Sequence, residues 1–359
     1  MPPSPATRTF VSLTGPAGNI GDALIRRGQL DWVRDTSDEL VVYVGDAPDG
    51  WMRHVAVPDD AILLRTKRSV GRWLWLLATA PSRPVLVFEA GEVPLDRGNV
   101  LRELVFLAET VVVSLKRGVV VRPPRGIRAP TDPARRIHAR AARMSRFALW
   151  RDAVSANLVG GGRVVPDIGF AAGVRPGLPW PERDELLVSL RGARPHPGPT
   201  WIHAVRATAS AHGLRIRTVV QVREDEDRAR ELAAELGGTF DPWGERDAVA
   251  QEALLRERYD GAKLVISDRM HVLVLAALSG AVPVELVPAP TGKITAAFAT
   301  IGLDDVSIDA AAHGTDELVR MLTARLDTAG EVRARVAAAA ERLAALEREV
   351  RAAIETARS

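Results

Sequence analysis

Short apolar runs and longer amphipathic segments alternate along most of the chain. Runs of apolar and β-branched residues predict strands, and segments with apolar residues at intervals of three and four predict helices between them. Strands are expected at 9–13, 39–45, 84–90, 163–170, 185–190, 216–222, 264–266 and 282–287. Because such alternation is typical of α/β domains with parallel sheets, the expected fold class is α/β.

The stretch 264–287 combines a strand, a polar turn, a helix with almost no polar face and a second strand. Gly280 is expected to end the helix. Arg269 and His271 therefore lie at the start of a buried helix, beyond the carboxyl end of a strand. Open α/β sheets bind ligands at that place, and the free N–H groups of a helix N-terminus favour an anion. An ordinary helix cap with solvated side chains fits the same pattern.

Length and proline spacing predict the domain organisation. The chain has 359 residues, which suits two domains of about 150 residues each. Pro176, Pro179 and Pro181 form the best candidate linker, because closely spaced prolines stop regular structure. We therefore expect an N-terminal domain over 1–175 and a C-terminal domain over 182–325.

A long amphipathic helix is expected at 330–357, where apolar residues recur at intervals of three and four. This stripe consists of Val332, Val336, Ala339, Leu343, Leu346, Val350 and Ile354. It either packs back on the domains or pairs with a second chain as a short coiled coil, and the pattern does not decide between them. A homo-oligomer is therefore left open.

Composition narrows the function classes. The chain carries 48 basic and 45 acidic residues, a net charge of +3, without the concentrated excess expected of a nucleic-acid-binding protein. Cysteine is absent, which excludes disulfides, thiolate zinc sites and a cysteine nucleophile. The apolar windows are too short for a membrane span, and no secretory signal is visible. We expect a cytoplasmic protein that needs no metal or cofactor.

A glycine-rich turn follows the first expected strand, with Gly15, Gly18 and Gly21 spaced by three. It is neither a dinucleotide-binding fingerprint nor a P-loop, but such glycines let the backbone approach a ligand closely. Asn19 and Asp22 are candidates for ligand contact and equally natural capping residues.

Further polar residues end expected strands or begin expected helices. Glu89 and Glu92 flank Gly91 at the end of the run 84–90 and either face the cleft or are solvated. Arg191 ends the run 185–190. Lys293 begins a helix, where it can reach an anion or lie on the surface.

Two charged segments have structural interpretations. Residues 135–151 are rich in arginine and alanine and predict a helix with a solvated basic face, with a membrane-surface or anionic-polymer contact as the alternative. The acids at 224–227 are expected to complement the dipole of the helix that they begin.

Three stretches together resemble the polysaccharide pyruvyl transferase family. They are GNIGDALI at 18–25, WRDAVS at 150–155 with PDIGFA at 166–171, and ISDRMHVLVLAALSGAVPVEL at 266–286. LLVSLR at 186–191 and the segment 220–237 continue the likeness in the family's order, so that it covers about residues 8–325. The resemblance implies two Rossmann-like domains facing across a cleft, as in GT-B glycosyltransferases.

The resemblance also implies transfer of pyruvate from phosphoenolpyruvate to two hydroxyls of a sugar, forming a cyclic ketal and releasing phosphate. Arg151, Arg269 and His271 match family motifs associated with donor binding and catalysis. Guanidinium groups bind carboxylates and phosphates through charge-assisted hydrogen bonds, so Arg151 and Arg269 are expected to hold the donor. His271 is the candidate general acid or base, because histidine titrates near neutral pH.

The complementary proton transfer has three further candidates, Asp22, Glu89 and Asp152. Asp152 alternatively orients Arg151 or caps its helix. The expected substrate-binding set is Gly18, Asn19, Gly21, Asp22, Asp152, Arg191, Lys293 and Glu89. Its partners would be phosphoenolpyruvate as donor substrate and a sugar, nucleotide-sugar or lipid-linked glycan as acceptor, with the acceptor on the N-terminal domain. A peripheral membrane contact is left open.

Two other functions fit the same pattern. One is a GT-B glycosyltransferase that uses a nucleotide-sugar, with the same arginines holding a diphosphate. The other is a non-catalytic glycan-binding relative that keeps the fold. The identity of the donor separates a glycosyltransferase from a pyruvyl transferase. Loss of activity with retained glycan binding would indicate the non-catalytic relative.

Overall fold

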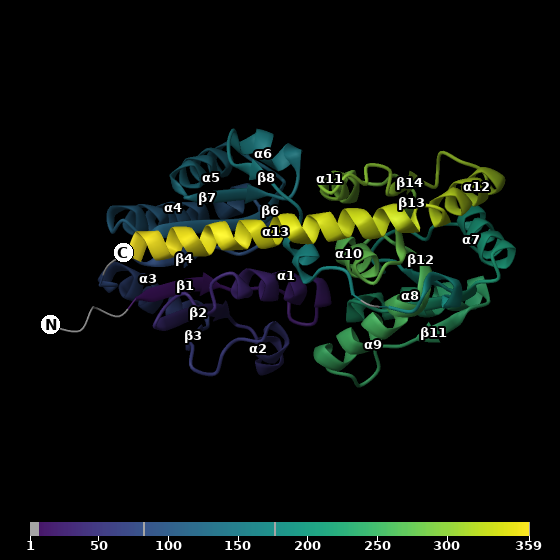
Figure 1. Ribbon diagram of the computed structural model, residues 1–359, viewed down its shortest axis with the longest axis horizontal. Helices are drawn as coiled ribbons and strands as arrows, with labels where there is room; N and C mark the ends of the chain where they lie inside the picture. The colour runs from purple at the N-terminus through teal and green to yellow at the C-terminus, as the bar shows by residue number, and fades with distance from the viewer. Residues whose placement is uncertain (1–6, 82, 176, 359) are drawn as a thin grey trace. The chain divides into compact units, whose positions relative to one another are not determined.

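The chain forms two α/β units in the computed structural model, which describes residues 7–81, 83–175 and 177–358 (Figure 1). Unit 1 comprises the described residues of 7–17, 22–171 and 342–358, and unit 2 comprises those of 18–21 and 172–341. Pro176 of the expected linker lies outside the described residues.

Unit 1 is built on a parallel sheet with the strand order β3-β2-β1-β4-β6-β7-β8, and β5 pairs with β6. Its strands are β1 (Arg8–Ser12), β2 (Glu39–Gly45), β3 (Ile62–Arg65), β4 (Val85–Val87), β5 (Gly91–Pro94), β6 (Val119–Arg128), β7 (Phe147–Trp150) and β8 (Arg163–Val164). Its helices are α1 (Ile20–Asp31), α2 (Asp49–Val55), α3 (Val70–Thr79), α4 (Val100–Leu115), α5 (Asp132–Met144) and α6 (Ala153–Val159), with short 3-10 turns η1 (Lys67–Ser69), η2 (Arg97–Asn99) and η3 (Ile168–Ala172).

Unit 2 contains a parallel sheet with the order β11-β10-β9-β12-β13-β14. Its strands are β9 (Glu185–Ser189), β10 (Arg215–Val219), β11 (Thr239–Asp241), β12 (Ala262–Ser267), β13 (Val282–Val287) and β14 (Ser307–Asp309). Its helices are α7 (Pro199–Ala211), α8 (Glu226–Leu236), α9 (Ala248–Gly261), α10 (Met270–Leu278), α11 (Lys293–Ala299) and α12 (Thr315–Leu326), with the 3-10 turns η4 (Trp180–Glu182) and η5 (Arg223–Asp225). In both sheets the first strand lies in the middle. The chain adds the next strands toward one edge, then returns to the middle and adds the remaining strands toward the other edge, which is the Rossmann arrangement.

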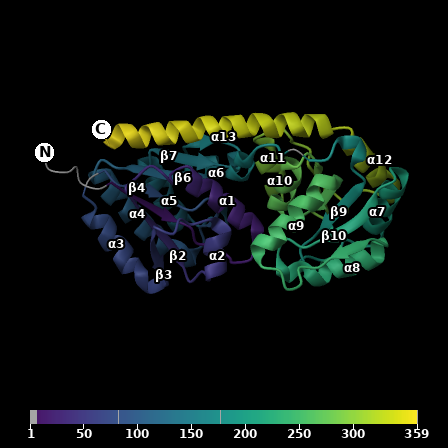
Figure 2. The same cartoon turned by 60° about the horizontal axis from the view of Figure 1, so that its bottom comes forward.

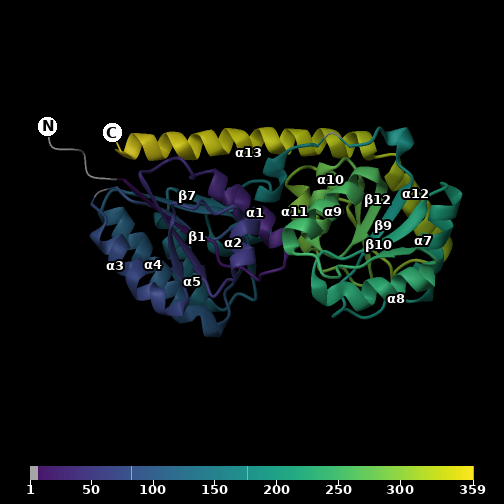
Figure 3. The same cartoon turned by 90° about the horizontal axis from the view of Figure 1, so that it is seen from below.

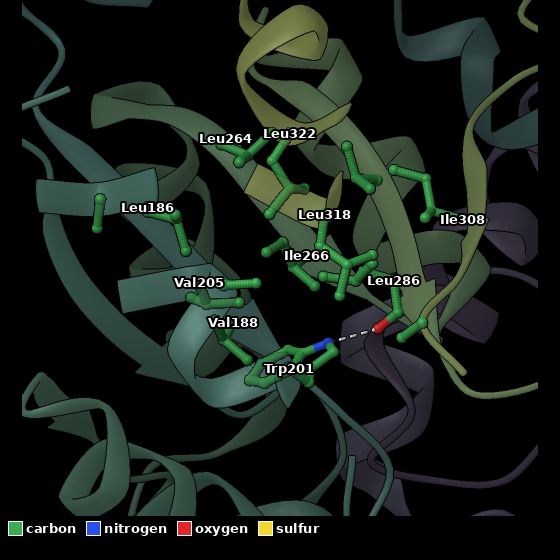
Figure 4. Close-up of a cluster of buried hydrophobic side chains, with 14 of the residues drawn as sticks. Leu186, Val188, Trp201, Val205, Leu264, Ile266, Leu286, Ile308, Leu318 and Leu322 are labelled. Carbon is green, nitrogen blue, oxygen red and sulfur yellow. Dashed lines mark hydrogen bonds between the residues drawn. The ribbon is translucent and has the colours of Figure 1, made fainter. Parts of the chain in front are cut away.

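The core of unit 2 explains why its strands read as continuous apolar runs. Helices α7, α8 and α12 cover one face of the sheet, where Leu186, Val188, Ile266 and other strand residues are fully buried (Figure 4). Trp201 of α7 fills this core and donates its Nε1 hydrogen to the backbone oxygen of Leu286 at 2.9 Å. Strands covered on both faces have no polar side, so period-two alternation is absent from their sequences.

The long C-terminal helix is confirmed as α13 (Ala329–Arg358), which runs as one continuous helix (Figure 2). Its residues up to Glu341 belong to unit 2 and those from Arg342 belong to unit 1. The expected apolar stripe, from Val332 to Ile354, is buried within this one chain. Among the described residues, no helix combines the length and apolar character needed to cross a bilayer.

Two expected elements are wrong. The basic segment 135–151 is not one helix, because α5 ends at Met144 and the bulky residues of β7 join the sheet. The strand expected at 163–170 is reduced to β8, and the chain then turns into η3. Asp167 drives this turn by accepting a hydrogen bond from the backbone N–H of Gly169 at 2.8 Å.

Candidate active site

The carboxyl ends of β9 and β12 form the switch point of unit 2, because the chain leaves these neighbouring strands toward opposite edges of the sheet. Ligands of open α/β sheets bind at such a point. The Ser267 hydroxyl joins the strand ends by donating to the backbone oxygen of Ser189 at 2.5 Å. It also accepts from the backbone N–H of Arg269 at 3.0 Å, which fixes the start of α10.

Asp268 holds two arginines at this edge. Its Oδ1 accepts from the backbone N–H of Arg191 at 3.0 Å, and its Oδ2 lies 3.1 Å from Nε of Arg194 and 3.9 Å from Nε of Arg191. The Asp268 side chain is only 1% exposed. Burial raises the pKa of this carboxyl group, against the opposing effect of the arginines. The same burial lowers the pKa of Arg191.

Asp225 plays the matching part for Arg269. Its Oδ2 accepts from Nε of Arg269, and its Oδ1 accepts from the backbone N–H of Gly192 at 3.0 Å. Asp225 is buried, so the acid run at 224–227 does more than complement a helix dipole, and the sequence interpretation of this residue is corrected. The pair orients the Arg269 guanidinium beside the N-terminus of α10.

A small cavity of about 50 Å³ opens beside Asp268. Arg191, Arg194, Arg228 and Asp268 line it together with prolines of the loop after β9. Its volume is far below the roughly 300 Å³ at which small-molecule pockets begin, so it fits one anionic group and not a whole ligand. Two cavities of about 420 and 840 Å³ lie at the amino ends of the strands, where α/β sheets do not carry their sites.

The same edge also contains two buried polar atoms that remain available for hydrogen bonds to a ligand. The hydroxyl of Ser189 and the Oε1 atom of Gln221 are buried and have no hydrogen-bond partner among the described residues. Both residues follow or end a central strand of unit 2. Because buried polar atoms are normally hydrogen-bonded, a bound ligand is a natural partner for them.

Gly21 lies against His271. A Cβ atom at position 21 would be 2.5 Å from the Cβ atom of His271 and 2.9 Å from Nε2 of Gln221. Both contacts are closer than side-chain atoms allow, so this position requires glycine while His271 keeps its place on α10. The glycine-rich segment 18–21 thus belongs to unit 2 and supports the candidate acid or base.

Three further expected residues, Gly18, Asn19 and Lys293, have other structural settings. Gly18 has a positive φ of 87°, which glycine adopts without strain, and a Cβ there would meet no atom within 4 Å. Asn19 caps the turn by accepting from the backbone N–H of Gly21 at 3.0 Å. Lys293 is exposed at the N-terminus of α11.

The corresponding edge of unit 1 is occupied by its own side chains. Glu89 follows β4 and accepts hydrogen bonds from the hydroxyls of Ser12 and Thr14, both at 2.5 Å. Arg26 donates to the backbone oxygens of Thr14 and Ala90, at 2.9 and 2.7 Å. Burial lowers the pKa of Arg26, although Glu89 and Asp22 oppose the shift.

Arg151 follows β7 in unit 1 and is almost fully buried. Its Nη1 lies 3.2 Å from Oδ2 of Asp167. Asp152 caps α6 by accepting from the backbone N–H of Ser155 at 2.6 Å. A Cβ at Gly126 would be 2.9 Å from Nε of Arg151, so the guanidinium packs on that glycine.

The structure therefore divides the expected site residues between the units. Arg191, Arg269, His271 and Gly21 gather around the switch point of unit 2, whereas Arg151, Asp152, Asp22 and Glu89 belong to unit 1. Sequence reasoning missed Asp268, Asp225, Arg194 and Asp167. Asp268 and Asp167 stand inside the stretches that carry the family resemblance, so their position next to Arg269 and before Gly169 was the available signal.

One group of residues has the composition of a metal site. His196, Glu231 and Glu235 place ligand atoms within 4.8 Å of one another. However, Nδ1 of His196 accepts from the backbone N–H of Gly198 at 3.1 Å, so its proton is on Nε2, which faces Glu235 at 3.1 Å. Glu231 pairs with Arg228 at 3.0 Å. These carboxylates are engaged in ion-pair contacts with His196 and Arg228, and we assign no metal to the group.

Comparisons with known proteins identify the fold. No protein-family model matches the sequence, and no curated protein matches it. The chain is similar over 93% of its length to 98% of UDP-GlcNAc 2-epimerase from Neisseria meningitidis bound to UDP-GlcNAc, with a TM-score of 0.55 and 10% identity. It is similar over 98% of its length to all (100%) of Anabaena Alr3699/HepE in complex with UDP, with a TM-score of 0.57 and 12% identity.

A third solved structure, the apo form of the lipopolysaccharide outer core galactosyltransferase WaaB, matches 98% of this chain over 98% of its own, with a TM-score of 0.52 and 11% identity. Likeness at such identities establishes the fold. The protein has the GT-B fold, with two Rossmann-like units and a long C-terminal helix.

Proposed function

We propose that this protein is an enzyme of glycan metabolism that binds the diphosphate of a nucleotide-sugar at the carboxyl edge of unit 2. The observation that carries the proposal is the convergence of Arg191, Arg194 and Arg269 on this edge, each held by a buried aspartate. A diphosphate offers several acceptor oxygens, and guanidinium groups bind such oxygens in pairs.

The start of α10 adds to this attraction. Its first N–H groups have no partner within the helix, and its dipole places partial positive charge beside Arg269. The arginines keep 18% to 41% of their side-chain surface exposed, so they remain accessible to a ligand. Buried aspartates and partly exposed guanidinium groups together form the anion-binding edge that we propose.

The solved structures of the same fold support the choice of ligand. One holds UDP-GlcNAc, and the Anabaena protein holds UDP in one structure and UDP-glucose in another. In glycosyl transfer, an acceptor hydroxyl attacks the anomeric carbon while the bond to the diphosphate breaks. Arginines at the diphosphate stabilise the negative charge of the leaving group. His271, at the start of α10, is the residue that we assign to proton transfer.

Calorimetric titration with UDP-glucose, UDP-GlcNAc and their GDP counterparts tests this function, followed by ³¹P NMR of the products with sugar acceptors present. We expect binding by the wild type, release of the nucleoside diphosphate on turnover, and loss of binding in Arg269→Ala. Binding of every nucleotide-sugar with unchanged affinity in Arg269→Ala would show that the diphosphate lies elsewhere.

Pyruvyl transfer is a second candidate, favoured by the size of the cavity between Arg191, Arg194 and Arg228. Phosphoenolpyruvate carries one phosphate and one carboxylate, and each fits a small guanidinium-lined space. In this reaction a proton adds to the methylene carbon, one sugar hydroxyl adds to the neighbouring enol carbon, and a second hydroxyl displaces phosphate. The products are the ketal and inorganic phosphate.

The same ³¹P experiment separates the two candidates. Release of inorganic phosphate from phosphoenolpyruvate, with the nucleotide-sugar intact as acceptor, would establish pyruvyl transfer and overturn glycosyl transfer. Release of nucleoside diphosphate without consumption of phosphoenolpyruvate would do the reverse. If neither donor binds, the anion-binding assignment of this edge is wrong and a non-catalytic glycan-binding protein remains.

A further inference from the structure

Three helices of unit 1 form an outer layer on its sheet. Helix α3 packs against α4, and α4 packs against α5 (Figures 1 and 3). The inner sides of α3 and α4 meet β1, β2, β4 and β6 through Trp73, Leu76, Leu77 and Val113. Their outer sides, with that of α5, form a single solvent-exposed surface, which we call the outer helical face.

The outer helical face exposes large apolar side chains. Trp75 of α3 is 62% exposed, and Leu101, Leu104 and Leu115 of α4 are 73%, 47% and 80% exposed. Met144 at the end of α5 is 37% exposed. Half of the large hydrophobic residues that are exposed in the described part of the chain lie on this one layer. A gathering of this kind marks an interaction surface, whereas single exposed apolar residues do not.

The charge of this face is one-sided. The helices α3, α4 and α5 contain six arginines and three aspartate or glutamate residues, whereas the whole chain is nearly balanced. The acids of α4, Glu103 and Glu109, are buried under the face. Asp132 is the exposed acid of the three helices, and it pairs with Arg135 and Arg136. The exposed cations of the three helices are Arg72, Arg136, Arg140 and Arg143, and the segments next to α3 and α4 add the exposed Lys67, Arg68, Arg97 and Arg117.

We propose that the outer helical face docks on an anionic lipid bilayer. This inference is independent of the proposed function. An interfacial helix layer needs apolar side chains that enter the acyl boundary and basic side chains that stay among the headgroups. Trp75 and the leucines of α4 supply the first, and the arginines of α3 and α5 supply the second. The amphipathic character of tryptophan also suits the headgroup level.

Charge argues against a second copy of this chain as the occupant. A twofold dimer would place the same positively charged patch on both sides of the interface. Like charges across an interface are unfavourable, whereas anionic headgroups compensate the same arginines. For the basic residues of 135–151 the sequence allowed a solvated face or, as the alternative, a membrane-surface or anionic-polymer contact. The proposal assigns those of α5 to anionic headgroups.

The test is cosedimentation of the full-length protein with phosphatidylcholine vesicles, with and without about 30% phosphatidylglycerol. We expect binding to the anionic vesicles only, weakened on raising the salt concentration from about 0.1 M to about 0.5 M. The triple variant Arg72→Gln/Arg140→Gln/Arg143→Gln should lower the partition coefficient roughly a hundredfold. The double variant Leu101→Ser/Leu104→Ser should lower it roughly tenfold without changing its salt dependence.

Matched controls keep the test specific. Arg206→Gln/Arg320→Gln/Arg348→Gln removes the same charge from exposed positions elsewhere, and Leu178→Ser/Val249→Ser removes comparable exposed apolar groups. Both controls should bind as the wild type does. Absence of vesicle binding, or equal loss in face and control variants, would overturn the proposal. Retention on heparin without vesicle binding would assign the face to a soluble polyanion instead. Thermal unfolding of each variant checks that the fold is kept.

Discussion

The two units share one strand order but differ at their carboxyl edges. In unit 1 the edge is closed by its own side chains, because Glu89 accepts from Ser12 and Thr14 while Arg26 binds backbone oxygens. In unit 2 the aspartates are buried and the arginines that they hold remain partly exposed. The two units have the same fold. At the edge of unit 1 the charged groups bind one another or the backbone, whereas the edge of unit 2 offers positive charge to a ligand.

Strand topology therefore locates a candidate site, and the hydrogen-bond partners of its side chains decide whether a ligand can use it. Arg26 and Arg125 of unit 1 are as cationic as the arginines of unit 2, but both are buried. Burial lowers the pKa of Arg125 to about 9. Its guanidinium is committed to the backbone oxygen of Glu89. An arginine becomes a ligand-binding group only where it keeps donors for the ligand.

Arg269→Ala is expected to have the largest effect. It removes a guanidinium from the open edge, and the affinity for the phosphorylated donor should fall roughly a hundredfold, about 3 kcal/mol. Arg230→Ala, at an exposed arginine of α8 paired with Glu226, is the control and should change affinity less than about twofold. Equal losses in both variants, measured by calorimetry, would mean that the edge of unit 2 has no special role.

Gly21→Ala is expected to have the next largest effect. The added Cβ would overlap His271 at 2.5 Å, so α10 or the segment 18–21 must shift. We expect kcat to fall roughly tenfold or more with a smaller change in KM, because the proton-transfer group is displaced. Gly261→Ala, where a Cβ meets no atom within 4 Å, should leave kcat unchanged. Wild-type turnover by Gly21→Ala would contradict the positioning role.

Glu89→Ala tests the closed edge. It leaves the hydroxyls of Ser12 and Thr14 without their acceptor and removes a negative charge beside the buried Arg26 and Arg125. The unfolding free energy should drop by about 2 kcal/mol with donor affinity unchanged. Glu92→Ala, which removes an ion pair with Arg128 at 3.5 Å, should cost less than about 1 kcal/mol. If Glu89→Ala abolished donor binding and kept its stability, the edge of unit 1 would be a ligand site after all.

Glu109→Gln should have the smallest effect and a defined pH dependence. Burial raises the pKa of Glu109 from 4.5 to about 7, although Trp73 donates to it at 2.9 Å. The folded state therefore holds a proton that the unfolded state loses, and stability falls as pH rises from about 4.5 to 7. Glutamine keeps the acceptor for Trp73 without the charge. Denaturant unfolding should show a gain of about 1 kcal/mol at pH 8 and almost none at pH 4.

The fold was largely readable from the sequence. Continuous apolar runs predicted strands buried on both faces, and β13 (Val282–Val287) was located to the residue. The errors came where helix propensity and burial compete. Alanine and arginine continue beyond Met144, and only the packing of Phe147, Leu149 and Trp150 against neighbouring strands makes β7 a strand. Tertiary packing overrides local preference at such places.

The site was readable only in part. Arg269, Arg191 and His271 follow strands directly, so local pattern placed them at the edge of a sheet. Asp225 belongs to the 3-10 turn η5, and its pairing with Arg269 joins residues 44 positions apart. Sequence alone gives no sign of such a contact. Whether Glu89 is available or internally bonded likewise depends on Ser12 and Thr14, about 75 residues earlier.

Hydrogen exchange measured by mass spectrometry, with and without saturating UDP-glucose, shows at which sheet edge the donor binds. We expect slower exchange in peptides covering 189–194 and 267–273 of unit 2, and unchanged exchange in peptides covering 12–15 and 88–91 of unit 1. The same pattern with phosphoenolpyruvate in place of UDP-glucose would identify phosphoenolpyruvate as the donor and keep the site at the edge of unit 2. Protection confined to the unit 1 peptides, with either compound, would mean that the donor does not bind at the edge of unit 2.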